Sequence, residues 1–134
     1  MVFLIGFILS GHGEFASGLY SSLKLIAGEQ EDFIVINFVN GCTSEQLSQK
    51  LIEGINKLAH CDHIVVFTDI AGGTPFNEAA KLSVQHNNVS VLSGTNLPTV
   101  LEGIFNRKLD VKEFLDKVVK AGKNSFKSFN KGDF

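Results

Sequence analysis

Four short apolar runs alternate with segments of helical periodicity along this chain, and this alternation strongly constrains its fold. The runs are Val2–Leu9, Phe33–Val39, His63–Thr68 and Val89–Leu92. Nearly unbroken apolar runs are typical of strands covered on both faces. Strands that alternate with helices form parallel sheets joined by right-handed crossovers. We therefore predict a doubly wound α/β fold with a mainly parallel four-stranded sheet and helices on both faces, and we take the strand order to be 2-1-3-4.

Helices are predicted between and after these strands, and capping signals mark several of their ends. The capping-box spacing places Glu or Gln three residues after a capping side chain. It occurs at Thr43 with Gln46 and at Asp110 with Glu113. The first helix is expected to end at Gly28, and the helix after the third strand to begin at Pro75 with Thr74 as its cap. A short helix is expected from near Asn96 and Pro98 to near Phe105, and the last helix is expected to end at Gly122.

The length of 134 residues is that of one domain that can bury its own core. We expect a single domain over 1–134, with the α/β core over 1–122 and a C-terminal tail over 123–134. The tail carries Phe126, Phe129 and Phe134 without a clear period. Its structure is therefore left open by the pattern alone.

The charge balance excludes several kinds of partner. Twelve Lys and Arg against 14 Asp and Glu give a net charge of −2, which provides no basic field for nucleic acid or an anionic membrane. Only 19% of residues are charged, against about 25% in typical proteins, which indicates a surface partly covered by a partner or a second copy. The N-terminal run lacks a basic flank and a cleavage site, and Cys42 and Cys61 form no disulfide scaffold. We expect a cytoplasmic protein.

Polar residues follow each predicted strand, where open α/β sheets form their sites. His12 follows the first strand between Gly11 and Gly13, at the start of a predicted helix. The glycines leave the imidazole accessible, and the helix N-terminus favours an anion attached to it. A turn histidine without a role is the alternative interpretation.

Asp69 follows the third strand and, in the order 2-1-3-4, would face His12 across the switch point of the sheet. A carboxylate on one ring nitrogen orients a histidine and frees the other nitrogen as nucleophile. The loop Gly72, Gly73 and Thr74 then offers backbone N–H groups and a hydroxyl to an anion. This combination predicts phosphoryl transfer, with Asp69 as a simple turn former being the alternative.

Three other motifs compete with this interpretation. Gly11-x-Gly13-x-x-Ala16 resembles a dinucleotide fingerprint, but no acidic residue ends the second strand, so a nucleotide-binding regulatory module is a secondary hypothesis. The run 60–63 (His-Cys-Asp-His) has the composition of a metal site but precedes the third strand, at the opposite end of the sheet, and is interpreted as a solvated loop. Cys42 is interpreted as a packing residue. We expect no metal and no cofactor, and a purely structural interaction domain is a third hypothesis.

Two segments together resemble a known family. Residues 10–18 (SGHGEFASG) resemble the phosphorylation region of the mannose-class IIA component of the bacterial sugar phosphotransferase system. Residues 68–77 (TDIAGGTPFN) resemble its second signature, and 94–98 (GTNLP) a third. The resemblance covers about residues 1–120. A sister family, the phosphotransfer subunit of dihydroxyacetone kinase, has a similar fold and histidine, but these motifs favour the mannose class.

The resemblance implies a role for each matching residue. His12 would accept a phosphoryl group on Nε2 from the phosphohistidine of the carrier HPr and pass it to a histidine of a IIB component. Asp69 would hold the other ring nitrogen, while Gly72, Gly73 and Thr74 would bind the phosphoryl group. The family also implies a homodimer, with the tail exchanged as a fifth, antiparallel strand, and contact with a membrane permease only through IIB. The transported sugar is not encoded in such a component.

Overall fold

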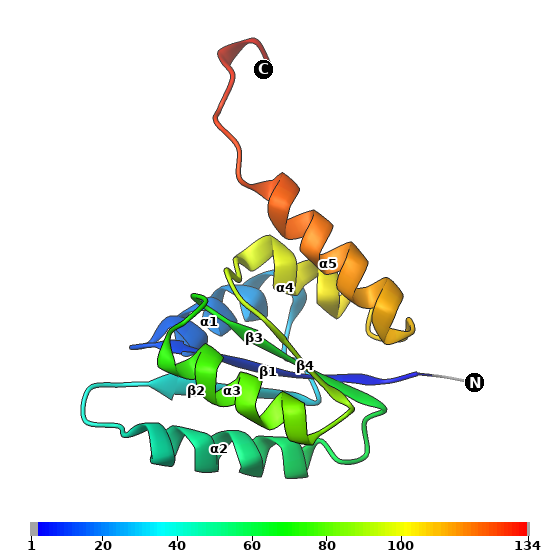
Figure 1. Ribbon diagram of the computed structural model, residues 1–134. Coiled ribbons are helices and arrows are strands. Elements are labelled where there is room, and N and C mark those ends of the chain that lie inside the picture. Colours follow the sequence, from blue (N-terminus) through cyan, green and yellow to red (C-terminus); the bar gives the residue numbers. More distant parts are fainter. Residues whose placement is uncertain (1–2, 134) are drawn as a thin grey trace.

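The computed structural model describes residues 3–133, which form a four-stranded parallel sheet flanked by helices (Figure 1). Strand β1 (Ile5–His12) lies between β2 (Phe33–Phe38) and β3 (His63–Thr68), and β4 (Val89–Leu92) pairs with β3. The observed order β2-β1-β3-β4 confirms the predicted sheet. Sequence order reverses between β1 and β3, so their carboxyl ends form the switch point.

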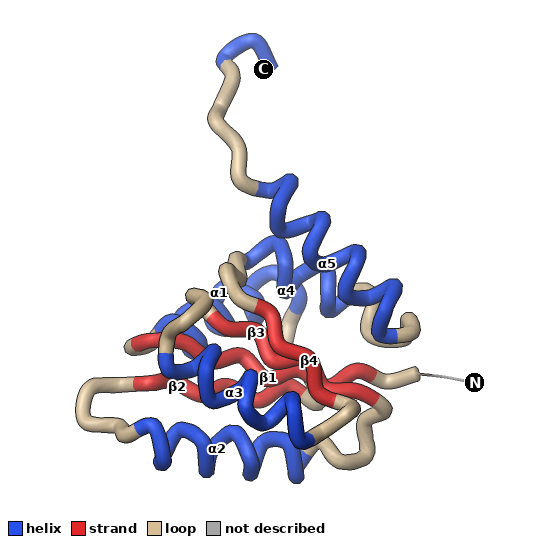
Figure 2. The backbone as a smooth tube through the Cα atoms, viewed as in Figure 1, coloured by secondary structure: helices blue, strands red, loops and turns tan. Residues whose placement is uncertain are grey.

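Helices cover both faces of the sheet, as predicted (Figure 2). The central strand β1 explains this, because its successive side chains enter two different cores. Ile8 packs into the core beneath α2 and α3, whereas Phe7 and Leu9 pack into the core of the opposite face. The helices are α2 (Ser44–Lys57) and α3 (Thr74–Gln85) on one face, and α1 (Phe15–Ala27), α4 (Leu97–Ile104) and α5 (Val111–Ser125) on the other.

The first strand differs from its predicted range at both ends. Val2 lies outside the described residues, and β1 begins at Ile5. At the other end, residues 10–12 continue the strand beyond Leu9, because Gly11 and His12 remain in register with β2. The Gly13 N–H donates to the Phe38 carbonyl at 2.7 Å and extends this pairing. His12 is therefore held by a strand that pairs with β2 at this position.

Most predicted helix ends are confirmed. Thr43 and Gln46 form the reciprocal capping box, and Asp110 accepts from the first backbone N–H groups of α5. Asn96 caps α4 by accepting from the Thr99 N–H. Gly28 follows α1 with a positive φ of 83°, a conformation that favours glycine.

Two predicted helix boundaries are wrong. Gly73 is the N-cap of α3, so Thr74 is its first residue. Gly122 does not end α5, which continues to Ser125. A Cβ added at Gly122 would lie 2.5 Å from Thr99 Oγ1, so this glycine allows α5 to pack closely on α4. Residues 126–133 leave the end of α5 and extend away from the sheet, with one 3-10 turn at Lys131–Asp133 (Figure 1).

Arg107 joins three segments at the amino ends of the strands. Its Nε donates to the Ile5 carbonyl at 3.0 Å, and its two terminal nitrogens donate to the carbonyls of Glu31 at 2.6 Å and Asp32 at 2.8 Å. The guanidinium carbon also lies 4.5 Å from the centre of the Phe7 ring. Burial lowers the pKa of Arg107, an effect that the nearby Asp32 carboxylate opposes. These contacts, called the Arg107 clamp, hold the start of β1 and the segment before β2 to the loop that follows α4.

Replacing Arg107 with methionine is expected to lower the free energy of unfolding by about 2–4 kcal/mol, because three carbonyls on two segments lose charged hydrogen-bond donors. Urea unfolding followed by circular dichroism measures this change. The matched control is Lys108→Met, which removes an exposed cation from the next position. Equal stabilities for the two variants would show that the clamp does not contribute.

Candidate active site

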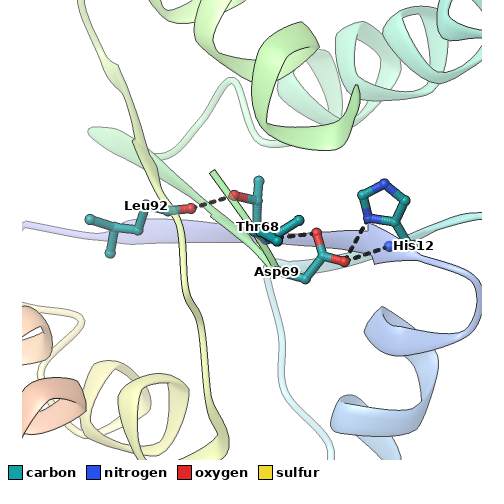
Figure 3. A network of polar contacts seen from close by, with 5 residues as sticks. His12, Thr68, Asp69 and Leu92 are labelled. Atoms are coloured by element: carbon teal, nitrogen blue, oxygen red, sulfur yellow. Dashed lines mark hydrogen bonds and ion pairs between the residues drawn. The ribbon is translucent and has the colours of Figure 1, made fainter. Parts of the chain in front are cut away.

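His12 and Asp69 meet at the switch point, as the topology predicts (Figure 3). His12 is the last residue of β1, and Asp69 directly follows β3. The His12 Nδ1 lies 2.8 Å from Asp69 Oδ2, and the same oxygen accepts from the His12 backbone N–H at 2.9 Å. The other carboxylate oxygen, Oδ1, accepts from the Ile70 N–H at 2.9 Å. Both oxygens of Asp69 are thus engaged by donors.

These contacts determine the ionisation of Asp69 and the tautomer of His12. Burial raises the pKa of Asp69, but hydrogen bonds from the backbone and ring of His12 and from the Ile70 N–H outweigh burial and bring this pKa below its usual value. An ionised carboxylate only accepts hydrogen bonds, so His12 Nδ1 carries a proton. The Nε2 of neutral His12 then bears a free lone pair, on a side chain that is 48% exposed.

The loop between β3 and α3 lies against the His12 ring. A Cβ added at Gly73 would be 2.6 Å from His12 Cε1 and 3.3 Å from Nε2, so the backbone of Gly73 approaches the nitrogen that Asp69 leaves free. Gly72 has a positive φ of 83°, and its carbonyl accepts from the Asn77 side chain at 3.0 Å. Thr74 begins α3, whose first backbone N–H groups lack helical acceptors. The predicted loop and His12 therefore lie together.

Contacts that the sequence did not predict hold this arrangement. The Phe38 ring packs edge-on against the His12 ring, with centroids 5.8 Å apart. The loop after β4 holds the backbone of Thr68 and Asp69. The Gly94 N–H donates to the Asp69 carbonyl and the Thr95 N–H donates to the Thr68 carbonyl, both at 3.1 Å. Phe38 could have been found by aligning the ends of the first two strands, because it is the register partner of His12.

Of the competing motifs, the glycine pattern lies beside His12, and the other two lie elsewhere. At Gly11, an added Cβ would lie 2.5 Å from the Phe15 ring and 3.0 Å from Asp69 Cγ. The absence of a side chain at Gly11 therefore leaves room for Phe15 and Asp69. Cys42 lies before α2, where its Sγ approaches the Thr43 carbonyl at 3.6 Å. His60 and Cys61 lie before β3, at the end of the sheet opposite His12, as predicted. Cys42 and the His60–Cys61 pair make none of the contacts described around His12.

The fold and the His12–Asp69 pair define an α/β domain with an accessible histidine at the switch point of its sheet. A family model described as "PTS system fructose IIA component" matches residues 6–119. The fructose-specific EIIA component of Bacillus subtilis (strain 168) is 31% identical over 124 residues, covering 92% of this chain and 85% of that protein. The mannose-specific EIIAB component of Escherichia coli (strain K12) is 29% identical over 126 residues, and the matched region is 92% of this chain but 39% of that protein.

Solved structures agree with this assignment. A phosphotransferase system EIIA component from Streptococcus agalactiae superposes with a TM-score of 0.86 at 36% identity, covering 94% of this chain and 98% of that chain. A mannose/sorbose-specific IIA subunit from Enterococcus faecalis has a TM-score of 0.87 at 22% identity, covering 95% and 96%, and shows the shared fold. The chain belongs to the mannose-class IIA family of the sugar phosphotransferase system.

Membership gives the general activity, which is that of a phosphotransferase carrier in sugar transport. It also favours the mannose class over the kinase-subunit and nucleotide-binding hypotheses. Within residues 3–133, every helix is too short or too polar to traverse a lipid bilayer.

Proposed function

We propose that His12 Nε2 accepts a phosphoryl group from the phosphohistidine of HPr and passes it to a histidine of a IIB component. The observation that carries this proposal is the hydrogen bond between His12 Nδ1 and Asp69 Oδ2, which leaves Nε2 unprotonated and exposed. In the transfer, the Nε2 lone pair forms the new N–P bond. The donor's P–N bond breaks, and its electron pair returns to the donor's ring nitrogen. Transfer to IIB repeats these steps with His12 as donor.

The surroundings of His12 support this reaction electrostatically. Once Nε2 carries phosphorus and Nδ1 keeps its proton, the ring is cationic, and the Asp69 carboxylate stabilises that charge. The transferred group is itself anionic and faces the start of α3. There the Thr74 hydroxyl, the unpaired N–H groups and the helix dipole favour it. Gly72 and Gly73 let this backbone approach without a side chain in between.

The rim of the site supports docking of protein partners. Ile70 is 57% exposed and Val39 is 45% exposed, although both are apolar. Ile70 follows Asp69, and Val39 follows Phe38, which contacts the His12 ring. Such residues bury apolar surface when a partner covers the site and excludes water.

We also propose that the protein is a homodimer in which the tail is exchanged. Phe126 and Phe129 are 94% and 65% exposed on a segment that extends from α5. Among the described strands, β4 lies at an edge of the sheet that such a segment could cover. Sedimentation equilibrium measures the assembly directly.

Incubation with phosphoenolpyruvate, the general phosphotransferase enzyme and HPr is expected to label the protein with acid-labile, base-stable phosphate. Adding a IIB component of the mannose class should then remove the label. Omitting HPr is the control, and labelling that is independent of HPr would contradict the proposed donor. Retention of the label with every mannose-class IIB component tested would contradict the proposed acceptor.

Replacing Gly73 with alanine is expected to slow labelling about tenfold to a hundredfold, because the new methyl group would displace the His12 ring from its position. The Gly73 backbone has an ordinary φ of −76°, so alanine there is compatible with the main chain. Gly18→Ala is the control, since a Cβ there meets nothing within 4 Å. Wild-type rates for Gly73→Ala would show that this contact does not position the ring.

A further inference from the structure

Asp32, His60 and Cys61 form a second cluster of reactive side chains, at the amino end of the sheet. Asp32 directly precedes β2, and the other two precede β3. One donor atom from each residue lies within 4.8 Å of the other two. His60 Nε2 and Asp32 Oδ1 are 2.7 Å apart, and Cys61 is only 4% exposed. The cluster therefore combines a sulfur, a nitrogen and an oxygen donor at one place.

The backbone holds these residues in position. Asp32 has a φ of 52°, which is the only positive φ at a non-glycine residue among 3–133. Its carbonyl accepts from the Phe7 N–H at 2.9 Å and from Arg107 at 2.8 Å, and these bonds maintain the uncommon conformation. Cys61 lies against Gly6, where an added Cβ would be 2.9 Å from its Sγ. Asp32 and Cys61 are thus oriented by the folded sheet itself.

We propose that Asp32, His60 and Cys61 bind a divalent cation of the zinc type, with water as the fourth ligand. Thiolate, imidazole and carboxylate are the donors that zinc accepts in a tetrahedral arrangement. Its bond lengths require donor atoms about 3.4–3.6 Å apart, so the His60–Asp32 contact opens slightly while the longer separations contract. The half-exposed His60 side chain makes this adjustment possible.

Binding is a ligand exchange without redox chemistry. The Cys61 thiol releases its proton to solvent. The proton that His60 Nε2 donates to Asp32 is also released, and Nδ1 takes up a proton from solvent so that the imidazole stays neutral. The freed Nε2 lone pair and the Asp32 Oδ1 then bind the cation. Burial and the nearby carboxylates of Asp32 and Asp62 raise the pKa of Cys61, whereas Arg107 lowers it. The thiolate and carboxylate together offset the charge of the cation. Arg107 directs its donors to backbone carbonyls, which leaves the carboxylate of Asp32 available.

The composition of this cluster differs from the run that the sequence singles out. Asp62 Oδ2 accepts from the Leu4 N–H at 2.7 Å, and His63 Nε2 lies 2.8 Å from Ser90 Oγ. Both residues are therefore engaged elsewhere, and Asp32 takes the carboxylate position from a distant part of the chain. This difference supplies matched controls, because the carboxylate and the histidine of the cluster each have a counterpart of the same type, Asp62 and His63, that is not in the cluster.

Titration of the full chain with cobalt(II), followed by competition with zinc, tests the proposal. We expect a thiolate-to-cobalt charge-transfer absorption that saturates at one equivalent and disappears when zinc is added. His60→Gln and Asp32→Asn should each weaken binding about tenfold or more, and Cys61→Ser should abolish the absorption. Asp62→Asn and His63→Gln should bind as the wild type does. Circular dichroism checks the fold of each variant, and His60→Gln alters an exposed side chain, so it remains informative if Cys61→Ser unfolds.

Absence of the absorption, or its loss in Asp62→Asn or His63→Gln to the same degree as in the proposed ligands, would overturn the metal site. Loss of binding in His12→Ala with full binding in His60→Gln would overturn it as well, by moving the cation to the other end of the sheet. Because the cluster shares no residue with the His12 site, these outcomes leave the proposed phosphoryl transfer unaffected.

Discussion

Replacing His12 with alanine is expected to abolish labelling from phosphoenolpyruvate, the general phosphotransferase enzyme and HPr. The imidazole supplies the lone pair that forms the N–P bond, and no other side chain described at the switch point offers a nitrogen nucleophile in its place. Quench-flow measurement of acid-labile phosphate should therefore show no incorporation above background. The fold should persist, because the side chain is 48% exposed and its removal opens no core cavity.

His86→Ala is the matched control, since His86 lies at the end of α3, before β4 and away from the switch point. It should be labelled at the wild-type rate and to one phosphate per chain. Labelling of His12→Ala at the wild-type level would overturn the assignment of the nucleophile. Loss of label in both variants, with both folded, would mean that the label depends on a second histidine.

Replacing Asp69 with alanine is expected to slow phosphoryl transfer about tenfold to a hundredfold, by analogy with the loss of carboxylates that orient metal-bound histidines. Without the carboxylate, the Nδ1 proton is no longer retained, so part of the His12 population has its proton on Nε2. The cationic phosphorylated ring also loses its counter-charge. Rapid-mixing kinetics with purified phosphorylated HPr measures the effect, and equal rates for wild type and Asp69→Ala would remove Asp69 from the mechanism.

Asp69→Asn separates hydrogen bonding from charge. One carboxylate oxygen faces the N–H groups of His12 and the other faces the Ile70 N–H. An amide has only one oxygen, so it must direct its NH₂ group toward a donor on one side. We therefore expect phosphoryl transfer in Asp69→Asn to be slower than in wild type. Its rate should not exceed that of folded Asp69→Ala.

The pH dependence of stability provides a separate measurement on Asp69. Its pKa is lower in the folded protein than in the unfolded chain, so the unfolded state binds more protons between the two values. The stabilisation from Asp69 is fully present above the unfolded pKa of about 3.9 and is lost as the pH falls through the lower folded value. Urea unfolding from pH 6 to pH 2 should show a steeper loss for wild type than for Asp69→Asn.

Much of the fold could be predicted because each signal is local. The four apolar runs and the capping residues depend on neighbours within a few positions, and their pattern indicated the parallel α/β sheet that the structure shows. The errors occurred where a long-range contact overrides the local preference. Gly122 has the character of a helix terminator, but Thr99 packs against it and the helix continues. Residues 10–12 have the composition of a turn, but pairing with β2 keeps them extended.

The sequence by itself determined the class of fold, the pairing of His12 with Asp69, and the glycine loop beside them. These follow from periodicity and from the rule that parallel strands direct their carboxyl ends to one edge. Only the tertiary structure decided which nitrogen of His12 is free, because the tautomer depends on where a carboxylate 57 positions away places its oxygens. It also decided that Asp32, and not Asp62, joins His60 and Cys61. Distances between remote side chains are set by packing, which no local pattern encodes.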